Sequence, residues 1–503
     1  MVLSLGLVFS VAAEESPELT LGETRFQGIT AAGGEVNAFL GVPFAQPPLG
    51  ALRWKAPRPP AYRAGKYPAV EFSPACFQGD HITMWYRDIV EGFGEDPDEI
   101  VAPVVSEDCL YLNLWRPARQ SGEALPVIVY VHGGSNRGGW SFEPNYHGHN
   151  LARRGVVVIS IAYRLGPFGF FAHPDLEQSN FALQDIVSAL RWIQEWAPAF
   201  GGDASRVTLM GESAGASNIA ALLAVPGARG LFQRVIHQSA GWAARELPTL
   251  STAQSLGVAL QDQVGASSLA ELRAVSAADI DAAAKFVYAE AGFDPAAGDR
   301  FLPIALSEQL EAGKLPPVDL LIGSNADEWK IYLTPGESLD SWLQQTLPKE
   351  LHPQAVKAVA ALGNEQRVLD ALITAKAFVC PSLDLARGVT TAGAKSWVYY
   401  FSRVRPGKKA SDMGAYHGAE LPYVFDTHDS WLPTAQDDRI LTVQMMDYWA
   451  SFARNGNPNT SGLPAWPAFA EGHEQVMQLD STLAVRPHPS AEICALLEDV
   501  KQK

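Results

Sequence analysis

Nearly unbroken runs of apolar residues mark the strands of a buried sheet. Four such runs are residues 127–131, 156–161, 318–323 and 396–401. Strands of a parallel sheet are covered on both faces, so they read as continuous apolar runs rather than as alternating ones. The runs therefore predict strands that lie side by side in one central sheet.

Helical spacing appears between these runs. Over residues 181–196 apolar side chains such as Ile186 and Ile193 recur with the period of an α-helix, and a strand is expected at 207–210. A strand, a helix and a second strand in this order predict a largely parallel sheet with helices on its faces.

Two further segments have a different texture. Residues 19–115 contain short alternating stretches broken by proline and glycine, which predicts an antiparallel opening. Residues 251–293 are rich in alanine and are expected to form a mostly helical insertion over the sheet. The fold class expected from the whole pattern is α/β, with a large, mostly parallel central sheet, helices on both faces and helical insertions.

The composition supports one large globular unit. The chain has 503 residues, of which 47% are hydrophobic and 18% charged, enough apolar material for a sizeable core. We therefore expect a single domain over residues 14–503. A net charge of −17 argues against nucleic acid and anionic membranes as partners, because both attract basic surfaces.

The first residues resemble a signal peptide. Residues 1–13 form an apolar stretch that ends in small residues, although no Lys or Arg precedes it. We interpret this segment as the remnant of a signal peptide and expect a secreted or periplasmic protein. No other apolar run is long enough to cross a bilayer, so no membrane insertion is expected.

The cysteines are even in number, which favours disulfides in an exported chain. They are Cys76, Cys109, Cys380 and Cys494. Four cysteines allow three pairings, and their spacing does not choose among them.

A candidate nucleophile lies in Gly211-Glu212-Ser213-Ala214-Gly215, between the strand that ends at Met210 and a helical run. A serine at such a strand-to-helix turn is held in a strained conformation, and glycines two residues before and after it avoid clashes. The turn presents the hydroxyl of Ser213 at the end of the sheet.

A second glycine-rich turn follows the strand at 127–131. It contains Gly133, Gly134 and Ser135. The backbone N–H groups of such a turn, together with that of Ala214 after the candidate nucleophile, are suited to stabilise an oxyanion.

A nucleophilic serine needs a histidine as base, and the base needs an acid, in the chain order Ser, acid, His. His417 lies in a loop after the strand expected at 396–401. The histidines that precede the expected acid, such as His132, do not fit this order, and His428 and His473 lack the preceding strand. The acid is expected after the strand at 318–323.

Either of two neighbouring residues could be that acid, Asp327 or Glu328. Position alone does not decide between them.

At this point the chain resembles the type-B carboxylesterase and cholinesterase family of α/β-hydrolases. The matching segments are residues 39–45, 106–113, 163–170, 200–203, 211–215, 237–239, 325–328 and 417–425. They follow the order of the family from about residue 20 to the C-terminus. The resemblance implies an α/β-hydrolase fold and a serine hydrolase that cleaves small-molecule carboxylic esters through an acyl-enzyme.

The resemblance also implies roles for individual residues. The family's acid is a glutamate, so the triad would be Ser213, Glu328 and His417. The family has a glycine after this acid where this chain has Trp329, and a third glycine in the oxyanion turn where this chain has Ser135. No metal or organic cofactor is implied, and a monomer or homodimer is expected.

The family's disulfides imply two pairs here, Cys76 with Cys109 and Cys380 with Cys494. Arg53 and Glu107 match a structural ion pair, and Glu212 is expected in the polar network around the nucleophile.

Two tryptophans are candidates for specificity. Trp242 is the candidate for an acyl pocket. Trp85 does not fall at the spacing of the choline-binding tryptophan of the cholinesterases, so no cation–π recognition of choline is implied.

Two rival functions remain. A non-enzymatic binding protein of the same fold would lack the serine, whereas this chain keeps Ser213. The same triad would also serve amides, thioesters, carbamates or lactones, which only substrate profiling separates.

Overall fold

The computed structural model describes residues 16–119, 122–240, 247–334 and 336–501. The expected signal-peptide remnant at residues 1–13 and the acyl-pocket candidate Trp242 lie outside these described residues.

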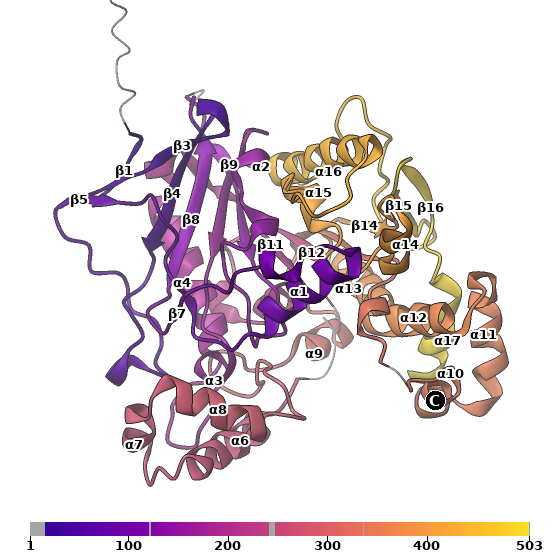
Figure 1. Cartoon of the computed structure of the whole chain (residues 1–503), viewed down its shortest axis with the longest axis horizontal. Coiled ribbons are helices and arrows are strands. Elements are labelled where there is room, and N and C mark those ends of the chain that lie inside the picture. Colours follow the sequence, from indigo (N-terminus) through magenta and orange to yellow (C-terminus); the bar gives the residue numbers. More distant parts are fainter. Residues whose placement is uncertain (1–15, 120–121, 241–246, 335, 502–503) are drawn as a thin grey trace, which may run out of the picture.

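One large sheet organises the described chain (Figure 1). In spatial order its eleven strands are β16 (Ala484–Pro487), β15 (Gln475–Leu479), β14 (Ser396–Phe401), β13 (Asp319–Asn325), β12 (Arg234–Gln238), β11 (Gly202–Glu212), β9 (Leu125–Val131), β10 (Val157–Ile161), β8 (Tyr111–Pro117), β4 (Val36–Pro43) and β3 (Ile29–Ala31). All pairs from β10 to β15 are parallel, whereas the pairs at the two ends of the sheet are antiparallel. The expected sheet is thus confirmed, with its antiparallel opening at β3, β4 and β8.

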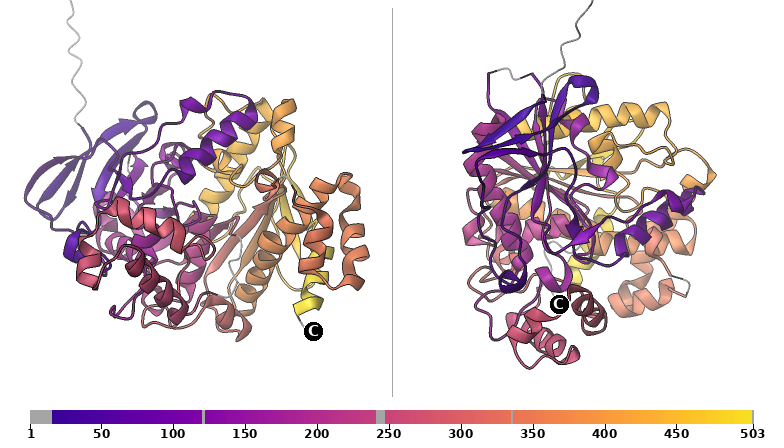
Figure 2. Two further views of the ribbon diagram at one scale, coloured as in Figure 1. Left: turned by 60° about the horizontal axis from the view of Figure 1, so that its bottom comes forward. Right: turned by 60° about the vertical axis from the view of Figure 1, so that its left-hand side comes forward.

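Alternate residues of a central strand face opposite sides of the sheet. In β9, Val127, Val129 and Val131 pack into one hydrophobic core, whereas Ile128 and Tyr130 pack into another. The first core is covered by α4 (Phe181–Trp196), α5 (Ala214–Leu223) and α13 (Cys380–Thr391), and the second by α15 (Leu421–Phe425) and α16 (Gln436–Asn455). Figure 2 shows helices on both sides of the sheet. This double cover explains why the strands read as unbroken apolar runs.

Two helical groups stand apart from these layers (Figure 1). The first is the expected insertion, with α6 (Leu250–Gln263), α7 (Leu269–Ala274) and α8 (Ala277–Val287). Leu260, Leu272 and Ile280 of this group form a small core of their own with Trp54 and Phe168. The second group contains α10 (Leu339–Thr346), α11 (His352–Val359), α12 (Glu365–Thr374) and α17 (Ala491–Lys501).

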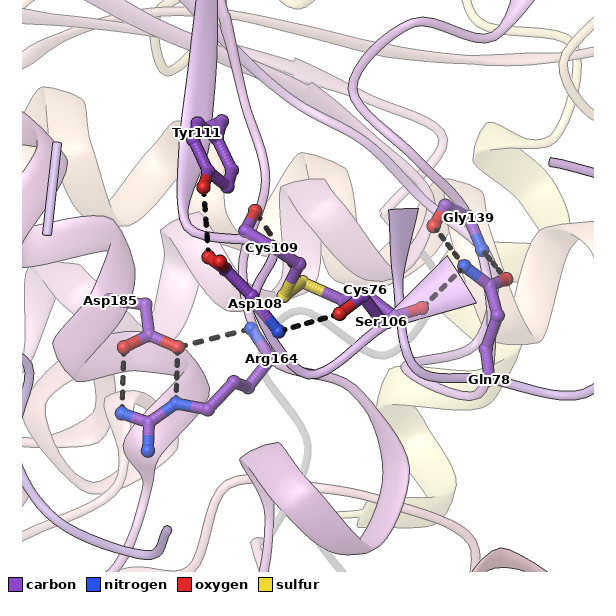
Figure 3. The surroundings of a disulfide bond; sticks show 9 residues. All are labelled: Cys76, Gln78, Ser106, Asp108, Cys109, Tyr111, Gly139, Arg164 and Asp185. Atoms are coloured by element: carbon purple, nitrogen blue, oxygen red, sulfur yellow. Dashed lines mark hydrogen bonds and ion pairs between the residues drawn. A yellow bond between two sulfur atoms is a disulfide. The ribbon is translucent and has the colours of Figure 1, made fainter. Parts of the chain in front are cut away.

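The structure contains two disulfides, Cys76–Cys109 and Cys380–Cys494, in the pairing that the resemblance implies. Cys76, at the end of β6 (Ala75–Cys76), is joined to Cys109 (Figure 3). Cys380, the first residue of α13, is joined to Cys494 of α17 across a sequence separation of 114 residues. No helix in the described residues combines the length and the apolar character that crossing a membrane requires.

Candidate active site

The turn between β11 and α5 presents Ser213. Its backbone has φ 53° and ψ −126°, in the left-handed half of conformational space that costs a non-glycine residue about 1 to 3 kcal/mol. The strain is held by the N–H of Ser213, which donates to the carbonyl of Gln238 at 2.9 Å. A Cβ on Gly211 would lie 2.9 Å from the carbonyl oxygen of Val131, and one on Gly215 only 2.2 Å from it. Both glycines of the motif are therefore required by close packing on β9.

A hydrogen-bonded line connects Ser213, His417 and Glu328. The Nε2 atom of His417 lies 2.8 Å from the Oγ of Ser213, and its Nδ1 atom lies 2.6 Å from Oε2 of Glu328. The other oxygen of Glu328 accepts the backbone N–H of Asn325 at 2.6 Å. Glu328 has no exposed surface, so its carboxylate is fixed between these two donors. The line can move a proton from the serine hydroxyl to the imidazole.

The neighbouring acid has a different task. Oδ2 of Asp327 accepts a hydrogen bond from the backbone N–H of Ala415 at 2.8 Å. The N–H of Asp327 in turn donates to the carbonyl of Ala415 at 3.1 Å. Asp327 therefore fastens the loop that carries His417, while Glu328 contacts the imidazole itself. Geometry thus separates two residues that their position in the sequence could not.

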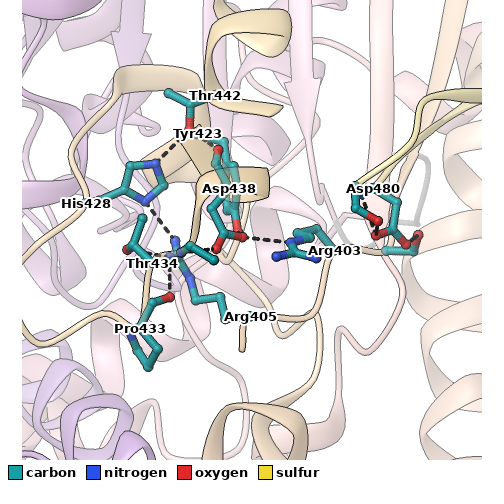
Figure 4. Close-up of polar contacts among 12 residues, drawn as sticks. Arg403, Arg405, Tyr423, His428, Pro433, Thr434, Asp438, Thr442 and Asp480 are labelled. Carbon is teal, nitrogen blue, oxygen red and sulfur yellow. Dashed lines mark hydrogen bonds and ion pairs between the residues drawn. The ribbon is translucent and has the colours of Figure 1, made fainter. Parts of the chain in front are cut away.

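The competing histidines lie elsewhere. His428 contacts Arg405 at 3.2 Å through Nδ1 and Thr442 at 2.7 Å through Nε2, as Figure 4 shows. His132 is buried and its ring stacks on Tyr163 at 4.4 Å. The contacts of His428 and His132 are thus with other residues, which hold the two rings in structural roles.

The predicted oxyanion turn begins a tight loop, residues 133–139, beside the nucleophile. A Cβ on Gly133 would lie 3.0 Å from Cβ of Ser213, so the loop packs directly on this serine. Gly134 has φ 106°, and a Cβ there would lie 2.2 Å from the carbonyl oxygen of Gly138. Ser135, which replaces the family's third glycine, has φ 55° and is exposed. The backbone is thus left-handed at this position although the residue is not glycine.

Ala214 is the first residue of α5, whose N-terminal N–H groups are free of helical partners and favour negative charge. With the 133–139 loop beside Ser213, the site brings together a serine hydroxyl, an imidazole and backbone N–H groups, the parts that acyl transfer requires.

A buried glutamate that sequence reasoning missed ties the loops of the site together. Glu420 accepts from the side-chain amide of Gln238 at 2.9 Å and from that of Asn325 at 2.6 Å. Asn325 also donates to the carbonyl of Tyr416, next to the base. The only signal in the sequence is that Glu420 lies in the segment matched to the family, because its partners are 95 and 182 residues away.

Glu212 adds a second carboxylate at the base. Its Oε1 lies 3.2 Å from Nε2 of His417. Burial lowers the pKa of His417, but the charge of Glu212 and the hydrogen bond with Glu328 outweigh burial and raise it to about 9. Burial raises the pKa of Glu212, whereas the charge of the protonated His417 opposes this increase. The imidazole therefore holds a proton more firmly than an ordinary histidine does.

A cavity of about 700 Å³ opens over the triad. Trp85, Trp329, Tyr332 and Phe378 form an aromatic wall of this cavity. The rings of Phe378 and Tyr332 lie 5.4 and 6.0 Å from that of His417, and Trp329 lies 5.1 Å from Tyr332. This wall gives the cavity an apolar side next to His417, suited to the organic groups of an ester.

Trp85 lies in the wall of the cavity. Its Nε1 donates to the hydroxyl of Tyr332 at 3.0 Å. A Cβ on Gly418 would lie 3.6 Å from the indole and 3.8 Å from Oε1 of Glu212. Helix α1 (His81–Phe93) carries Trp85, so this helix supplies part of the aromatic wall.

Among the described residues, no group of three or more His, Cys, Asp or Glu side chains is placed to hold a metal ion. The Arg53–Glu107 pair lies outside the cavity wall, with Nε of Arg53 2.7 Å from Oε2 of Glu107.

Comparison with known proteins gives a consistent result. The model of the carboxylesterase family matches residues 15–497. The para-nitrobenzyl esterase of Bacillus subtilis (strain 168) is 34% identical over 493 residues, covering 93% of this chain and 96% of the relative. The human cocaine esterase is 33% identical, covering 91% of this chain and 86% of the relative.

Another relative is the fumonisin B1 esterase of Sphingopyxis macrogoltabida, 31% identical with 94% of this chain and 88% of the relative covered. Among solved structures, a PNB esterase superposes with a TM-score of 0.79 at 31% identity and covers 95% of this chain and 99% of its own. The similarity therefore extends over the length of the chain in both sequence and fold.

Proposed function

The chain belongs to the carboxylesterase family, and from this premise we propose that Ser213 is its nucleophile, His417 its general base and Glu328 the acid that orients the base. As a member of this family it has the α/β-hydrolase fold and is a serine hydrolase that cleaves carboxylic esters. The observation that carries the assignment is the line of two hydrogen bonds from Ser213 Oγ through His417 to Glu328, at 2.8 and 2.6 Å.

The reaction proceeds in two halves. Ser213 Oγ attacks the ester carbonyl while Nε2 of His417 takes the hydroxyl proton. The negative charge that develops on the carbonyl oxygen is met by backbone N–H groups of Gly134, Ser135 and Ala214. His417 then gives its proton to the leaving alcohol oxygen, and the acyl-enzyme remains on the serine. Water repeats the attack, with His417 again as base, and releases the acid.

Gly133 belongs to the same oxyanion site. Because it packs directly on Ser213, it fixes the position at which the loop begins. Each oxyanion donor of this kind is worth about a hundredfold or more in rate.

The substrate is a small-molecule ester with apolar groups. The cavity of about 700 Å³ and its aromatic wall support this proposal. No cofactor or metal enters the reaction as proposed, because proton transfer and charge stabilisation are carried by the residues named above.

A p-nitrophenyl ester series, from acetate to long acyl chains, tests the assignment. We expect Ser213→Ala to lower kcat by about 10⁶ and to abolish labelling by an organophosphate. Ser217→Ala is the matched control, because this second serine also lines the cavity and should keep both activities. Unchanged hydrolysis by Ser213→Ala would refute the proposal.

We further propose that residues 14–503 form one domain and that the protein acts in a secreted or periplasmic setting, as a monomer or homodimer. The continuous sheet supports the first point. The two disulfides support the second, because such bonds persist in oxidising compartments. Cell fractionation tests the compartment, light scattering tests the oligomeric state, and a single cooperative unfolding transition would support the single domain.

A further inference from the structure

The side-chain amide of Gln78 forms hydrogen bonds with the backbone of the 133–139 loop. Its Nε2 donates to the carbonyl of Gly139 at 2.8 Å, while its Oε1 accepts the N–H of the same residue at 2.7 Å. The remaining N–H of the amide donates to the carbonyl of Cys76 at 3.1 Å. Figure 3 shows this arrangement beside the Cys76–Cys109 disulfide. Gln78 is buried, and two of its three hydrogen bonds hold Gly139 while the third holds Cys76.

At Gly139, the end of the loop packs against its first residue, Gly133, and against His132 just before it. A Cβ on Gly139 would lie 2.4 Å from Nδ1 of His132 and 2.6 Å from the carbonyl oxygen of Gly133. The N–H of Gly138 donates to the carbonyl of Gly134 at 3.1 Å. The two ends of the loop are therefore in close contact. A shift of Gly139 would displace Gly133 and Gly134, which precede Ser135.

The middle of the loop needs support from outside. Ser135 and Asn136 both have left-handed backbone angles, with φ 55° and 58°. Non-glycine residues keep this conformation only where the surrounding structure enforces it. One support is the side chain of Asn136, which donates to the carbonyl of Phe293 and accepts from Asn218 of α5, each at 2.8 Å. Gln78 supplies the support at the other end.

We propose that Gln78 is a positioning residue for ester hydrolysis, which holds the oxyanion donors of the 133–139 loop in place and links them to the Cys76–Cys109 disulfide. The inference rests on the proposed function, because it takes this loop as the source of the donors. Gln78 does not touch the reacting atoms. It acts through Gly139, and its loss leaves the triad and the aromatic wall of the cavity in place.

Oxyanion donors act only when they are aimed at the oxygen within a fraction of an ångström. Replacing Gln78 by leucine removes all three hydrogen bonds while keeping a similar volume. We therefore expect kcat/KM of Gln78→Leu to fall about 10- to 100-fold, up to the scale of one lost donor. Substrate binding that precedes the chemistry should be unaffected.

The test uses a pair of inhibitors that differ in one respect. A trifluoromethyl ketone forms a covalent hemiketal oxyanion with the nucleophile, whereas the matching methyl ketone binds without forming it to a comparable extent. For Gln78→Leu we expect the Ki of the fluorinated ketone to rise by the same factor by which kcat/KM falls, with the Ki of the methyl ketone unchanged.

Gln194→Leu is the matched control. The amide of Gln194, on α4 and outside the cavity wall, also donates to two backbone carbonyls, those of Ala204 and Leu231, each at 2.9 Å. Its replacement should lower Tm and leave kcat/KM and both Ki values unchanged. Gln78→Glu, which keeps the acceptor for Gly139 and loses the donors, should fall between wild type and Gln78→Leu, and it replaces the leucine variant if that does not fold.

Normal kcat/KM and a normal Ki for the fluorinated ketone in either folded Gln78 variant would overturn the inference. A loss of Tm alone, as in Gln194→Leu, would also overturn it, because that is the result of a structural role. If wild type itself does not prefer the fluorinated ketone over the methyl ketone, the proposed oxyanion chemistry fails, and the inference fails with it.

Discussion

Oε1 of Glu212 lies 3.2 Å from Nε2 of His417, the same nitrogen that faces Ser213 Oγ. A carboxylate at this place has two opposite effects on the reaction. It stabilises the imidazolium that forms during attack, and it makes the resting imidazole harder to deprotonate.

The pH profile should reveal this contact. As the proposed base, His417 would act only in its neutral form, and the lowering effect of burial is outweighed by Glu212 and Glu328, which raise the pKa of His417 to about 9. Activity should therefore increase as the pH rises through the neutral and mildly alkaline range. In Glu212→Gln the acid limb of kcat/KM should move to lower pH, while the plateau falls roughly tenfold through loss of the anionic neighbour. An acid limb that stays in place would contradict this account.

Substitutions of the two adjacent acids, Glu328 and Asp327, should have clearly different effects on kcat. Glu328→Gln keeps the shape of the side chain but removes the charge that orients and stabilises the imidazole, so we expect kcat to fall about 10³- to 10⁴-fold. Asp327→Asn is the matched control. It weakens the hold on Ala415 and should lower Tm with less than a tenfold loss of kcat. The reverse order of the two kcat values would make Asp327 the acid.

Two neighbouring positions of the 133–139 loop should respond differently to substitution: position 135 should tolerate glycine, whereas position 134 should require it. Ser135→Gly relieves a left-handed residue, and we expect a gain of roughly 0 to 1 kcal/mol in unfolding free energy with kcat/KM within about threefold of wild type. Gly134→Ala should lose activity about a hundredfold or more, since its Cβ would meet the carbonyl of Gly138 at 2.2 Å. Urea unfolding and kcat/KM measure both.

Trp329 should restrict the size of the ester. Its ring packs beside Tyr332 in the cavity wall, where the family has only a glycine after the acid. We expect Trp329→Gly to raise the ratio of kcat/KM for a bulky ester to that for p-nitrophenyl acetate about tenfold. The ratio is the proper measure, because any general loss of stability cancels. An unchanged ratio would show that the indole does not limit the substrate.

The two disulfides should differ in what they support. Removing Cys380–Cys494 with two alanines should cost about 3 to 5 kcal/mol of unfolding free energy, given its separation of 114 residues, and leave the kcat of the folded enzyme unchanged. Removing Cys76–Cys109 should lower kcat as well, because Gln78 is attached beside it. Equal kcat values for the two variants would remove the link between the first disulfide and the loop.

Local pattern was sufficient for elements with a regular helical period or an unbroken apolar run. The helix at Phe181–Trp196 and the strand at Ser396–Phe401 have the expected limits. Strand β11 begins at Gly202, five residues before the expected strand, because its first part carries polar residues such as Asp203 that a search for apolar runs passes over. The strand is nevertheless paired there, with Gly202 opposite Leu125.

The site was predictable where one short motif contains the chemistry and not where distant segments meet. The turn at Ser213 could be read from its two glycines. The choice of Glu328 over Asp327 required a family resemblance, since both follow the same strand. Gln78 and Glu420 could not be found, because their partners lie 61 and up to 182 residues away and nothing in the local sequence records that approach.

The bond between Cys380 and Cys494 closes the last quarter of the chain into a covalent ring, and His417 is carried inside this ring. A protease that cuts one exposed loop between these cysteines opens the ring without releasing a fragment. His417 therefore stays covalently connected to the rest of the protein, whichever side of it the cut falls on. An esterase nicked there once should still migrate as one chain until a reductant is added.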